Sequence, residues 1–472
     1  MINLTRRLVL MSALAVTAVL LTGIPAVAAK PGQPNIVFLL VDDLGIKDLS
    51  CYGSEFHESP NIDQLASQGI CFTNAYASHP TCGPSRTGIV TGKFPARMNL
   101  LTNTGAVRNG EMLWPKVLQQ HGYATYFLGK WHMGNANSVF DNGFDVNIAG
   151  CGVGQPSDYY FPYKSDIKKC DVPDMEDGKP GDYLTDALTD KALKLLDGNG
   201  DKPFLLYFSY FNVHKPAISN AQGKKEHVES FNRKLESMPQ VDLTLKEVVR
   251  GGHKVQSVPA QRNPEFAGQI KALDDSVGRI MQKLDELGIA DNTIVVLTSD
   301  QGSMCTSRKG VSTAAPYRFG KGFLFEGGIR VPLIVKWPGH MTPGTTNPTV
   351  TINTDIYPTM MDILGLPKRN QQHMDGISIV ETFEGTTMRF NRTFYWAFPQ
   401  NHALGHRPSL AIRRGPYKLI YWPENGVTEL YDVESDISES VDLSRQKSEL
   451  AAELLKGLKA WKPASTVLAK FE

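Results

Sequence analysis

The stretch Asn-Ile-Val-Phe-Leu-Leu-Val at residues 35–41 runs directly into two carboxylates, Asp42 and Asp43. An apolar run of this length, rich in β-branched and aromatic residues, is typical of a strand buried on both faces of a sheet. Three more apolar runs, at residues 124–129, 204–208 and 293–297, also lead into polar side chains. The pattern therefore predicts four buried strands with chemically active residues at their ends.

Helical patterns lie between these runs, at residues 61–68, 113–121 and 266–287, and a glycine directly follows each of them. Glycine just past a helix end is a common stop signal. Strands that alternate with helices predict an α/β fold whose largely parallel sheet is covered on both faces. Sites in such sheets form at the carboxyl ends of the strands, so the polar residues there are expected to meet in one site.

The pattern changes after about residue 365, where short strands at 411–413, 417–422 and 428–432 precede a helix at 450–458. We expect a smaller antiparallel α+β subdomain there. The predicted division is a signal peptide at 1–29, a catalytic domain at 30–365 and a C-terminal subdomain at 366–472. Residues 215–264 are polar and weakly periodic, which predicts an irregular insertion near the site.

The first 29 residues have the features of a secretory signal peptide. Arg6 and Arg7 precede an apolar run at 8–24, and Ala26-Val27-Ala28 fits a cleavage site. The alternative is an uncleaved membrane anchor, for which the run is short. The arginine pair also fits a twin-arginine signal, so the export route stays open. We expect an exported protein, periplasmic or extracellular, with no stable membrane insertion after cleavage.

Net charge and cysteine content limit the function classes. The 472 residues carry 49 basic and 48 acidic side chains, a net charge of +1, so no overall field attracts nucleic acid. The six cysteines are too sparse for a disulfide scaffold and lack zinc-binding spacing. Their pairing cannot be deduced from the sequence; they are Cys51, Cys71, Cys82, Cys151, Cys170 and Cys305.

One motif indicates the function much more specifically than net charge or cysteine content does. Cys82-Gly83-Pro84-Ser85-Arg86, followed by Thr91-Gly92, resembles the signature of the type I, formylglycine-dependent sulfatases, Cys-x-Pro-Ser-Arg-x-x-x-x-Thr-Gly. The stretches at residues 59–66, 129–134 and 321–332 also resemble that family, and the resemblance covers nearly the whole mature chain. It implies an alkaline-phosphatase-like α/β/α sandwich and a hydrolase that releases sulfate, expected to act on a sulfated carbohydrate.

The resemblance implies that a formylglycine-generating or anaerobic maturation enzyme oxidises Cys82 to an aldehyde, which hydrates to a gem-diol. One hydroxyl attacks sulfur, and loss of the second hydroxyl's proton expels sulfate, which a single serine hydroxyl could not do. The same resemblance implies a metal site. Its four oxygen-donor residues suit a hard cation, which favours Ca²⁺ over Zn²⁺. Its implied ligands are Asp42, Asp43, Cys82, Asp300 and Gln301, where the family commonly has asparagine at the last position.

Five other residues take catalytic roles by the same resemblance. Arg86, Lys130 and Lys321 are expected to contact the sulfuryl group, whose spread negative charge fixed cations stabilise. His132 is expected to remove the proton from the second diol hydroxyl, and His214 to protonate the departing alcohol.

Substrate contacts are predicted from weaker signals. His402, His406 and Arg407 lie in a polar stretch of the C-terminal part, which is either a plain surface loop or part of the saccharide pocket. Trp396 and Trp422 could stack on sugar rings, although aromatic residues more often belong to the core. The segments 135–180, 215–264 and 395–410 are expected to decide which sugar and which sulfate position are recognised.

Two other functions stay open at this point. A phosphonate or phosphate ester hydrolase of the same superfamily would share the fold and the metal-binding acids. A sugar-binding protein without catalysis would lack one or more of these site residues. A membrane-bound phosphoethanolamine transferase is excluded, because the required membrane spans and threonine nucleophile are absent from the sequence.

Overall fold

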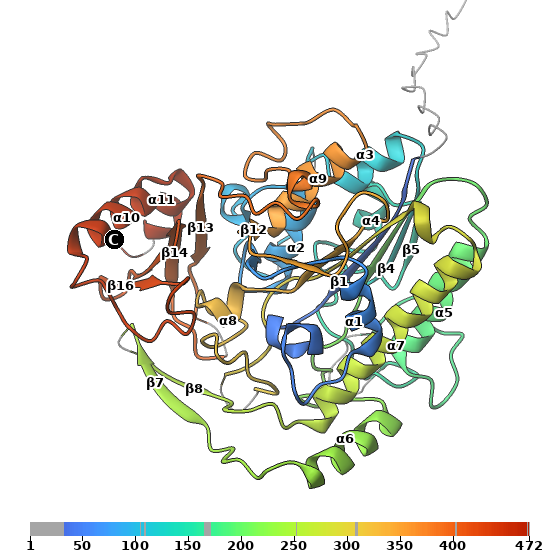
Figure 1. Cartoon of the computed structure of the whole chain (residues 1–472), viewed down its shortest axis with the longest axis horizontal. Helices are drawn as coiled ribbons and strands as arrows, with labels where there is room; N and C mark the ends of the chain where they lie inside the picture. Colours follow the sequence, from blue (N-terminus) through green and yellow to red (C-terminus); the bar gives the residue numbers. More distant parts are fainter. Residues whose placement is uncertain are drawn as a thin grey trace, which may run out of the picture.

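The computed structural model describes residues 33–469 and 471, except 104, 108, 109, 165–170, 252, 307–309, 402 and 403. Its centre is an eight-stranded mixed sheet with the strand order β11-β2-β10-β9-β1-β6-β4-β5 (Figure 1). The strands are β1 Asn35–Val41, β2 Ile70–Phe72, β4 Ala124–Gly129, β5 Val146–Ile148, β6 Phe204–Ser209, β9 Thr293–Ser299, β10 Leu333–Lys336 and β11 Thr345–Asn347. The four predicted strands are β1, β4, β6 and β9, and all four run parallel, whereas β10 is antiparallel to β9 and β2.

Alternate residues of β1 face two different cores. Val37 and Leu39 pack with helices α1, α5 and α7, and Phe38 and Leu40 pack with α2, α3 and α9. The bounds are α1 Pro60–Ser67, α2 Cys82–Thr91, α3 Trp114–Gln120, α5 Leu184–Asp197, α7 Pro264–Glu286 and α9 Ile356–Ile363; the short α4 Asn137–Asp141 precedes β5. Helices thus cover both faces of the sheet, which confirms the predicted α/β/α sandwich (Figure 1).

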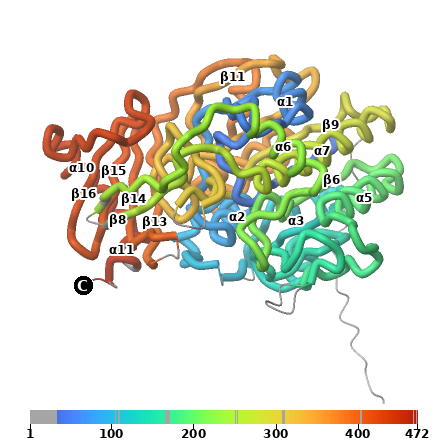
Figure 2. Tube along the Cα trace, turned by 90° about the horizontal axis from the view of Figure 1, so that it is seen from below, coloured from blue at the N-terminus to red at the C-terminus, as the bar shows by residue number. Residues whose placement is uncertain are grey.

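A four-stranded antiparallel sheet, in the order β13-β14-β15-β16, forms one end of the molecule (Figures 1 and 2). Its strands are β13 Thr393–Phe398, β14 Ser409–Arg414, β15 Tyr417–Trp422 and β16 Val427–Asp432. Helices α10 Ser448–Ala460 and α11 Lys462–Leu468 pack beside it. The predicted antiparallel C-terminal part is confirmed, with β13 as an additional strand.

The prediction of an irregular insertion at residues 215–264 is wrong. This segment contains helix α6 Lys225–Ser237 and the hairpin β7 Lys246–Arg250 and β8 His253–Ser257. Phe231 of α6 is buried against Phe56, and the hairpin reaches the C-terminal sheet, where Gly251 N–H donates to Glu429 Oε1 at 3.0 Å (Figures 1 and 2). Contacts with distant parts of the chain therefore order a segment whose own sequence pattern is weak.

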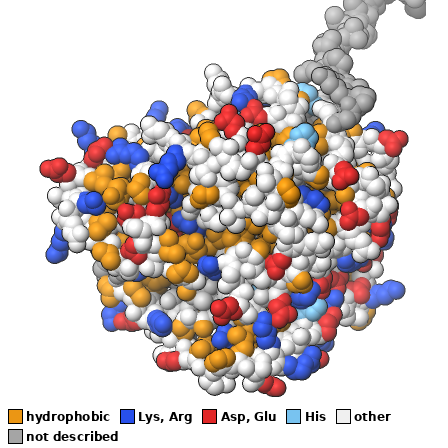
Figure 3. Space-filling view, viewed as in Figure 1, with side chains coloured by type: hydrophobic (Ala, Val, Ile, Leu, Met, Phe, Trp, Pro, Cys, Tyr) orange, Lys and Arg blue, Asp and Glu red, His pale blue; other side chains and the backbone are white. Residues whose placement is uncertain are grey.

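The predicted signal peptide and Cys170 lie outside the described residues. Among the residues that the structure describes, no helix is long and apolar enough to span a bilayer. Cys51, Cys71, Cys82 and Cys305 carry free thiols. On the face shown in Figure 3, acidic and basic side chains are interspersed, in keeping with the net charge of +1.

Candidate active site

Strand ends of the central sheet bring together seven of the ten residues predicted to bind the metal or catalyse. Asp42 and Asp43 follow β1, Lys130 and His132 follow β4, His214 follows β6, and Asp300 and Gln301 follow β9. Asp42, Asp43, Asp300 and Gln301 are at most 1% exposed. The parallel register explains this convergence, because β1 pairs with β6 and β9, and β4 pairs with β6.

Cys82 is the first residue of α2 and lies at the centre of this group. Its Sγ accepts from Lys321 Nζ at 3.2 Å, and Gln301 Nε2 lies 3.6 Å and Asp43 Oδ1 3.9 Å away. Burial raises the pKa of the Cys82 thiol to about 12, although Lys130 and Lys321 oppose the rise. The unmodified residue is thus a neutral thiol at pH 7 and a poor nucleophile.

Each of the three carboxylates lies within 2.7 Å of a different cation. Lys130 Nζ lies 2.5 Å from Asp42 Oδ2, Lys321 Nζ lies 2.6 Å from Asp43 Oδ1, and Arg86 Nε lies 2.7 Å from Asp300 Oδ2. Charges within this cluster are therefore balanced. Addition of a divalent cation would leave the site net positive, which suits an anionic ester.

Several buried oxygen atoms of the cluster have no hydrogen-bond partner. They are Asp42 Oδ1, Asp43 Oδ2 and Gln301 Oε1. Buried oxygens without partners are costly unless a ligand satisfies them, and a set of carboxylate and amide oxygens suits Ca²⁺. Donor atoms of Asp43, Cys82 and His214, and of Asp42, Cys82 and Asp300, lie within 4.8 Å of one another, so the group can surround one ion. The cluster fits the metal that the sequence led us to expect.

The pKa values of two of these carboxylates move in opposite directions. Burial raises the pKa of Asp42, but the charges of Lys130 and Arg86 outweigh burial and hold that pKa below its usual range. Burial raises the pKa of Asp300 to about 7, against the opposing charge of Arg86. A bound divalent cation would favour the ionised form of both groups.

The two predicted histidines border the cluster. Burial lowers the pKa of His132, and Lys130 adds to this effect, so its imidazole is neutral at pH 7. Burial also lowers the pKa of His214 to about 4, with Lys321 lowering it further. His214 Nδ1 lies 2.8 Å from the Lys215 carbonyl oxygen, which fixes the proton on Nδ1 and turns Nε2 toward Asp43 Oδ2 at 3.5 Å.

Three neighbouring residues hold the site in place, and sequence reasoning gave them no such role. Ser209 Oγ accepts from Arg86 Nη1 at 2.6 Å and so aims the guanidinium. Ser85 Oγ donates to the Asp300 carbonyl at 2.5 Å, which fastens α2 to the end of β9. Asn103 Oδ1 accepts from Gly83 N–H at 3.1 Å. Only Ser85, a fixed position of the Cys-x-Pro-Ser-Arg motif, carried a signal in the sequence.

Gly154 is a further position that the sequence did not single out. A Cβ on Gly154 would lie 2.7 Å from His132 Cε1 and 2.8 Å from Nε2. The ring of His132 therefore rests against a surface that only glycine leaves open.

We expect Gly154→Ala to lower kcat by about tenfold or more, since a displacement of a catalytic group by 1 Å can cost this much. Steady-state kinetics on a sulfate ester would measure the effect. Gly198→Ala is the matched control, because its added Cβ would meet nothing closer than 3.5 Å. Equal kcat values for the two variants would show that His132 tolerates displacement.

The three residues predicted to contact the substrate have different surroundings. His402 lies outside the described residues. Arg407 is exposed, and its Nη1 lies 3.3 Å from Asn401 Oδ1. His406 is 1% exposed and packs between the rings of Phe323 and Phe398, so the structure gives it no access to a saccharide.

Neither tryptophan proposed to stack on sugars is available for that role. Trp396 is fully buried and donates through Nε1 to the Ala77 carbonyl at 2.8 Å, and Trp422 is 3% exposed. Both rings belong to the core of the C-terminal sheet. That interpretation of the sequence is wrong.

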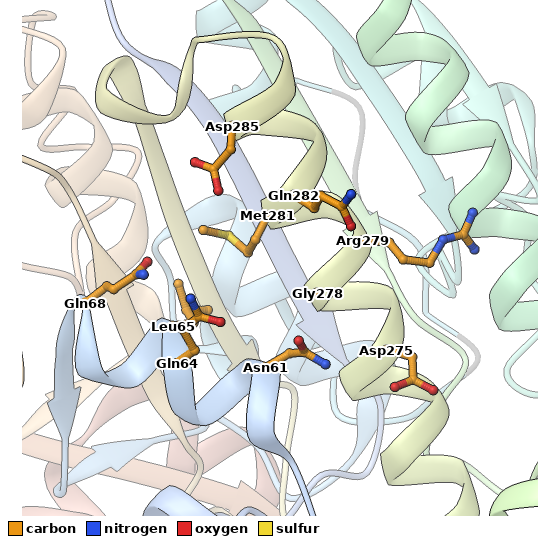
Figure 4. A pocket seen from close by; sticks show the side chains of 10 residues that line it. All are labelled: Asn61, Gln64, Leu65, Gln68, Asp275, Gly278, Arg279, Met281, Gln282 and Asp285. Carbon is orange, nitrogen blue, oxygen red and sulfur yellow. The ribbon is translucent and has the colours of Figure 1, made fainter.

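A groove of about 520 Å³ lies between α1 and α7, and none of the predicted metal-binding, catalytic or substrate-binding residues line it. Figure 4 shows polar side chains of both helices around it, among them Asn61, Gln64 and Arg279. The catalytic candidates are thus separate from this groove.

At the strand ends of this α/β/α sandwich, fixed cations and carboxylate oxygens without hydrogen-bond partners surround the position of a nucleophile. This arrangement defines a hydrolase of anionic esters. The chain belongs to the sulfatase family, whose model matches residues 34–366, and it is a sulfuric ester hydrolase. A second model, described as N-sulphoglucosamine sulphohydrolase, C-terminal, matches residues 317–463.

Similar proteins include two carbohydrate sulfatases. The chain is 28% identical to an N-acetylglucosamine-6-O-sulfatase of Bacteroides thetaiotaomicron, over 86% of this chain and 81% of the relative. It is also 28% identical to an N-acetylgalactosamine-6-sulfatase of Rattus norvegicus, over 84% and 72% of the two chains. The solved structure of Ps i-CgsB in complex with k-i-k-neocarrahexaose matches with a TM-score of 0.73 and 28% identity, covering 91% of this chain and 92% of that chain.

Proposed function

We propose that this sulfatase hydrolyses sulfate esters of a saccharide, using formylglycine at position 82 and a Ca²⁺ ion. One observation carries the proposal. The Cys82 side chain lies within 3.9 Å of Lys321, Gln301 and Asp43, beside buried oxygens that have no hydrogen-bond partner. A metal ion would bind the buried oxygens, and a reactive group at position 82 would lie beside that ion and Lys321.

Asp42, Asp43, Asp300 and Gln301 would hold the calcium ion. Rotation of the Gln301 amide by 180° exchanges its nitrogen and oxygen, so Oε1 can face the ion. The bound ion supplies positive charge next to the nucleophile and the sulfate oxygens. The hydrated aldehyde of formylglycine supplies two hydroxyls on one carbon, one to attack sulfur and one through which sulfate is released.

The cations and histidines of the chain take the remaining roles. Lys321, 3.2 Å from the position 82 side chain, would stabilise charge on the nucleophile, and Lys130 and Arg86 would stabilise charge on the sulfuryl oxygens. Neutral His132 would accept the proton of the second hydroxyl. His214 is neutral in the free site, and an incoming anionic ester favours its protonated form, which would then donate to the leaving alcohol.

Similar proteins support a saccharide substrate. One of them is an N-acetylglucosamine-6-O-sulfatase, and the solved structure of another is in complex with k-i-k-neocarrahexaose. A phosphonate monoester hydrolase of Agrobacterium radiobacter shares the fold, with a TM-score of 0.62, at 20% identity. The fold alone therefore does not separate sulfate from phosphonate esters, and the sulfatase family match favours sulfate.

Export and maturation complete the proposal. The signal-peptide pattern at residues 1–29 supports secretion to the periplasm or the cell exterior. The match of the Cys82 motif supports modification by a formylglycine-generating or anaerobic maturation enzyme.

Arg407 is proposed to bind the saccharide. We expect Arg407→Ala to raise KM on the natural saccharide by about fivefold, the scale of one exposed ion pair, with kcat little changed. Arg414→Ala, another exposed arginine of the C-terminal sheet, is the control. An unchanged KM in Arg407→Ala would remove this residue from the site.

A panel of esters tests the proposed reaction. Mature enzyme with Ca²⁺ would be incubated with sulfated oligosaccharides, aryl sulfates and the matched phosphate and phosphonate esters. Ion chromatography would measure the released anion. We expect sulfate release, fastest from a saccharide; release of phosphate or phosphonate alone would move the enzyme to the other branch of the superfamily.

A further inference from the structure

A second cavity, of about 380 Å³, lies against the four-stranded C-terminal sheet and contains none of the catalytic candidates. Its lining is unusually rich in arginine: Arg330, Arg389, Arg392 and Arg413 all contribute. Glu434 is the one acidic residue among the residues that line it. A wall with this charge composition suits an anion.

Two of the four arginines already have carboxylate partners. Arg330 Nε lies 2.8 Å from Glu326 Oε2, and the two terminal nitrogens of Arg392 each lie 2.9 Å from an oxygen of Asp355. These ion pairs fix the walls of the cavity. The charge available to a ligand therefore comes from Arg389 and Arg413.

Arg413 is 1% exposed, and its guanidinium is only partly satisfied. Nε donates to the Gly415 carbonyl at 3.0 Å, and Nη1 donates to the Tyr76 hydroxyl. Nη2 is buried without a hydrogen-bond partner, and Glu434 Oε1 lies 3.7 Å away, beyond hydrogen-bond range. A buried charged donor without a partner costs free energy, so a ligand that satisfies it would bind favourably.

Arg389 differs from the buried Arg413, because its side chain is exposed at the rim of the cavity. No ion pair of Arg389 is found among the described residues. Phe390, the next residue, lines the cavity as well and offers an apolar surface. A rim arginine beside an aromatic ring and a buried arginine with a spare N–H form a built site for an oxyanion.

We propose that this cavity binds an oxyanion, either free inorganic sulfate or a sulfate group of a saccharide. Arg413 Nη2 would donate to the anion from the buried end, and Arg389 would close over it from the rim. Glu434 would weaken binding, because its carboxylate competes for Arg413. The saccharide source rests on the proposed function, whereas binding of the free anion does not.

Crystals of the full chain soaked in selenate, an analogue of sulfate with an anomalous signal, test the site directly. We expect a selenium peak in the cavity within hydrogen-bond distance of Arg413 Nη2. Arg389→Ala should raise the selenate concentration for half-occupancy about tenfold, the scale of one charge-assisted hydrogen bond. Glu434→Gln should lower that concentration, and Arg445→Ala, an exposed arginine outside the cavity, should leave it unchanged.

A second measurement separates the two sources of the anion. Retention of the same variants on an immobilised sulfated polysaccharide should fall in Arg389→Ala if a saccharide sulfate enters the cavity. Retention equal to that of the unaltered enzyme, together with a selenium peak, would assign the cavity to the free ion. Absence of a selenium peak at this cavity would overturn the proposal, and this result does not depend on whether the enzyme hydrolyses sulfate esters.

Discussion

Cys82→Ala is expected to abolish sulfate release, with kcat lower by at least about 1,000-fold, since removal of a covalent nucleophile costs this much or more. The residue lies within 3.2 Å of Lys321 at the centre of the cluster, and no other described side chain takes its place. Ion chromatography of released sulfate, with saturating substrate and Ca²⁺, would measure the loss.

Two further variants make this result specific. Cys305→Ala removes another cysteine that is 1% exposed and should retain activity, which controls for general disruption of the fold. Cys82→Ser keeps one hydroxyl, so it should form a sulfate ester on residue 82 and stop after one turnover. Repeated turnover by Cys82→Ala would contradict the assigned nucleophile.

Removal of calcium is expected to have a comparable effect. Chelation with EGTA should abolish activity, and added Ca²⁺ should restore it, because the unpaired oxygens of Asp42 and Asp43 need a cation. Asp43→Asn removes one ligand charge and should raise the Ca²⁺ concentration for half-maximal activity at least about tenfold. Activity titrations with buffered Ca²⁺ would measure both effects.

Asp48→Asn is the matched control for this experiment. Asp48 is also fully buried, and burial raises its pKa to about 7, so asparagine replaces a group that is already partly neutral at pH 7. Its calcium requirement should equal that of the unaltered enzyme. Full activity in EGTA, or equal calcium requirements in Asp43→Asn and Asp48→Asn, would contradict a calcium site at Asp43.

The central fold could be predicted from local patterns because its strands are fully buried. The run at 35–41 corresponds to β1 residue for residue, and 124–129 corresponds to β4. Burial on both faces requires apolar side chains at consecutive positions, which makes such strands visible in the sequence. Since sites in parallel sheets form at the carboxyl ends of the strands, these runs also predict that Asp42, Lys130 and Asp300 lie together.

Elements stabilised by distant contacts were not predicted. Helix α6 fully buries only Phe231 and is mostly polar, and the tip of the β7–β8 hairpin contacts the C-terminal sheet through Gly251 and Glu429. The apolar residues of α6 have helical spacing, but they are too few among its polar residues for the sequence to predict the helix. A distant contact also explains Gly154, whose role depends on a ring 22 positions earlier in the chain.

The sequence also does not show whether a given side chain is buried or exposed in the fold. Trp396 and His406 have the chemistry of sugar-binding residues, but the paired strands β13 and β14 turn the tryptophan inward, and aromatic rings enclose the histidine. Residue type alone does not distinguish a core aromatic from an exposed one.

Mass spectrometry of the peptide that contains residue 82, from enzyme of known specific activity, tests the central claim most directly. We predict the mass of the aldehyde, in a fraction that rises in proportion to activity across preparations with and without the maturation enzyme. Unmodified cysteine alone, in a fully active preparation, would contradict the formylglycine mechanism.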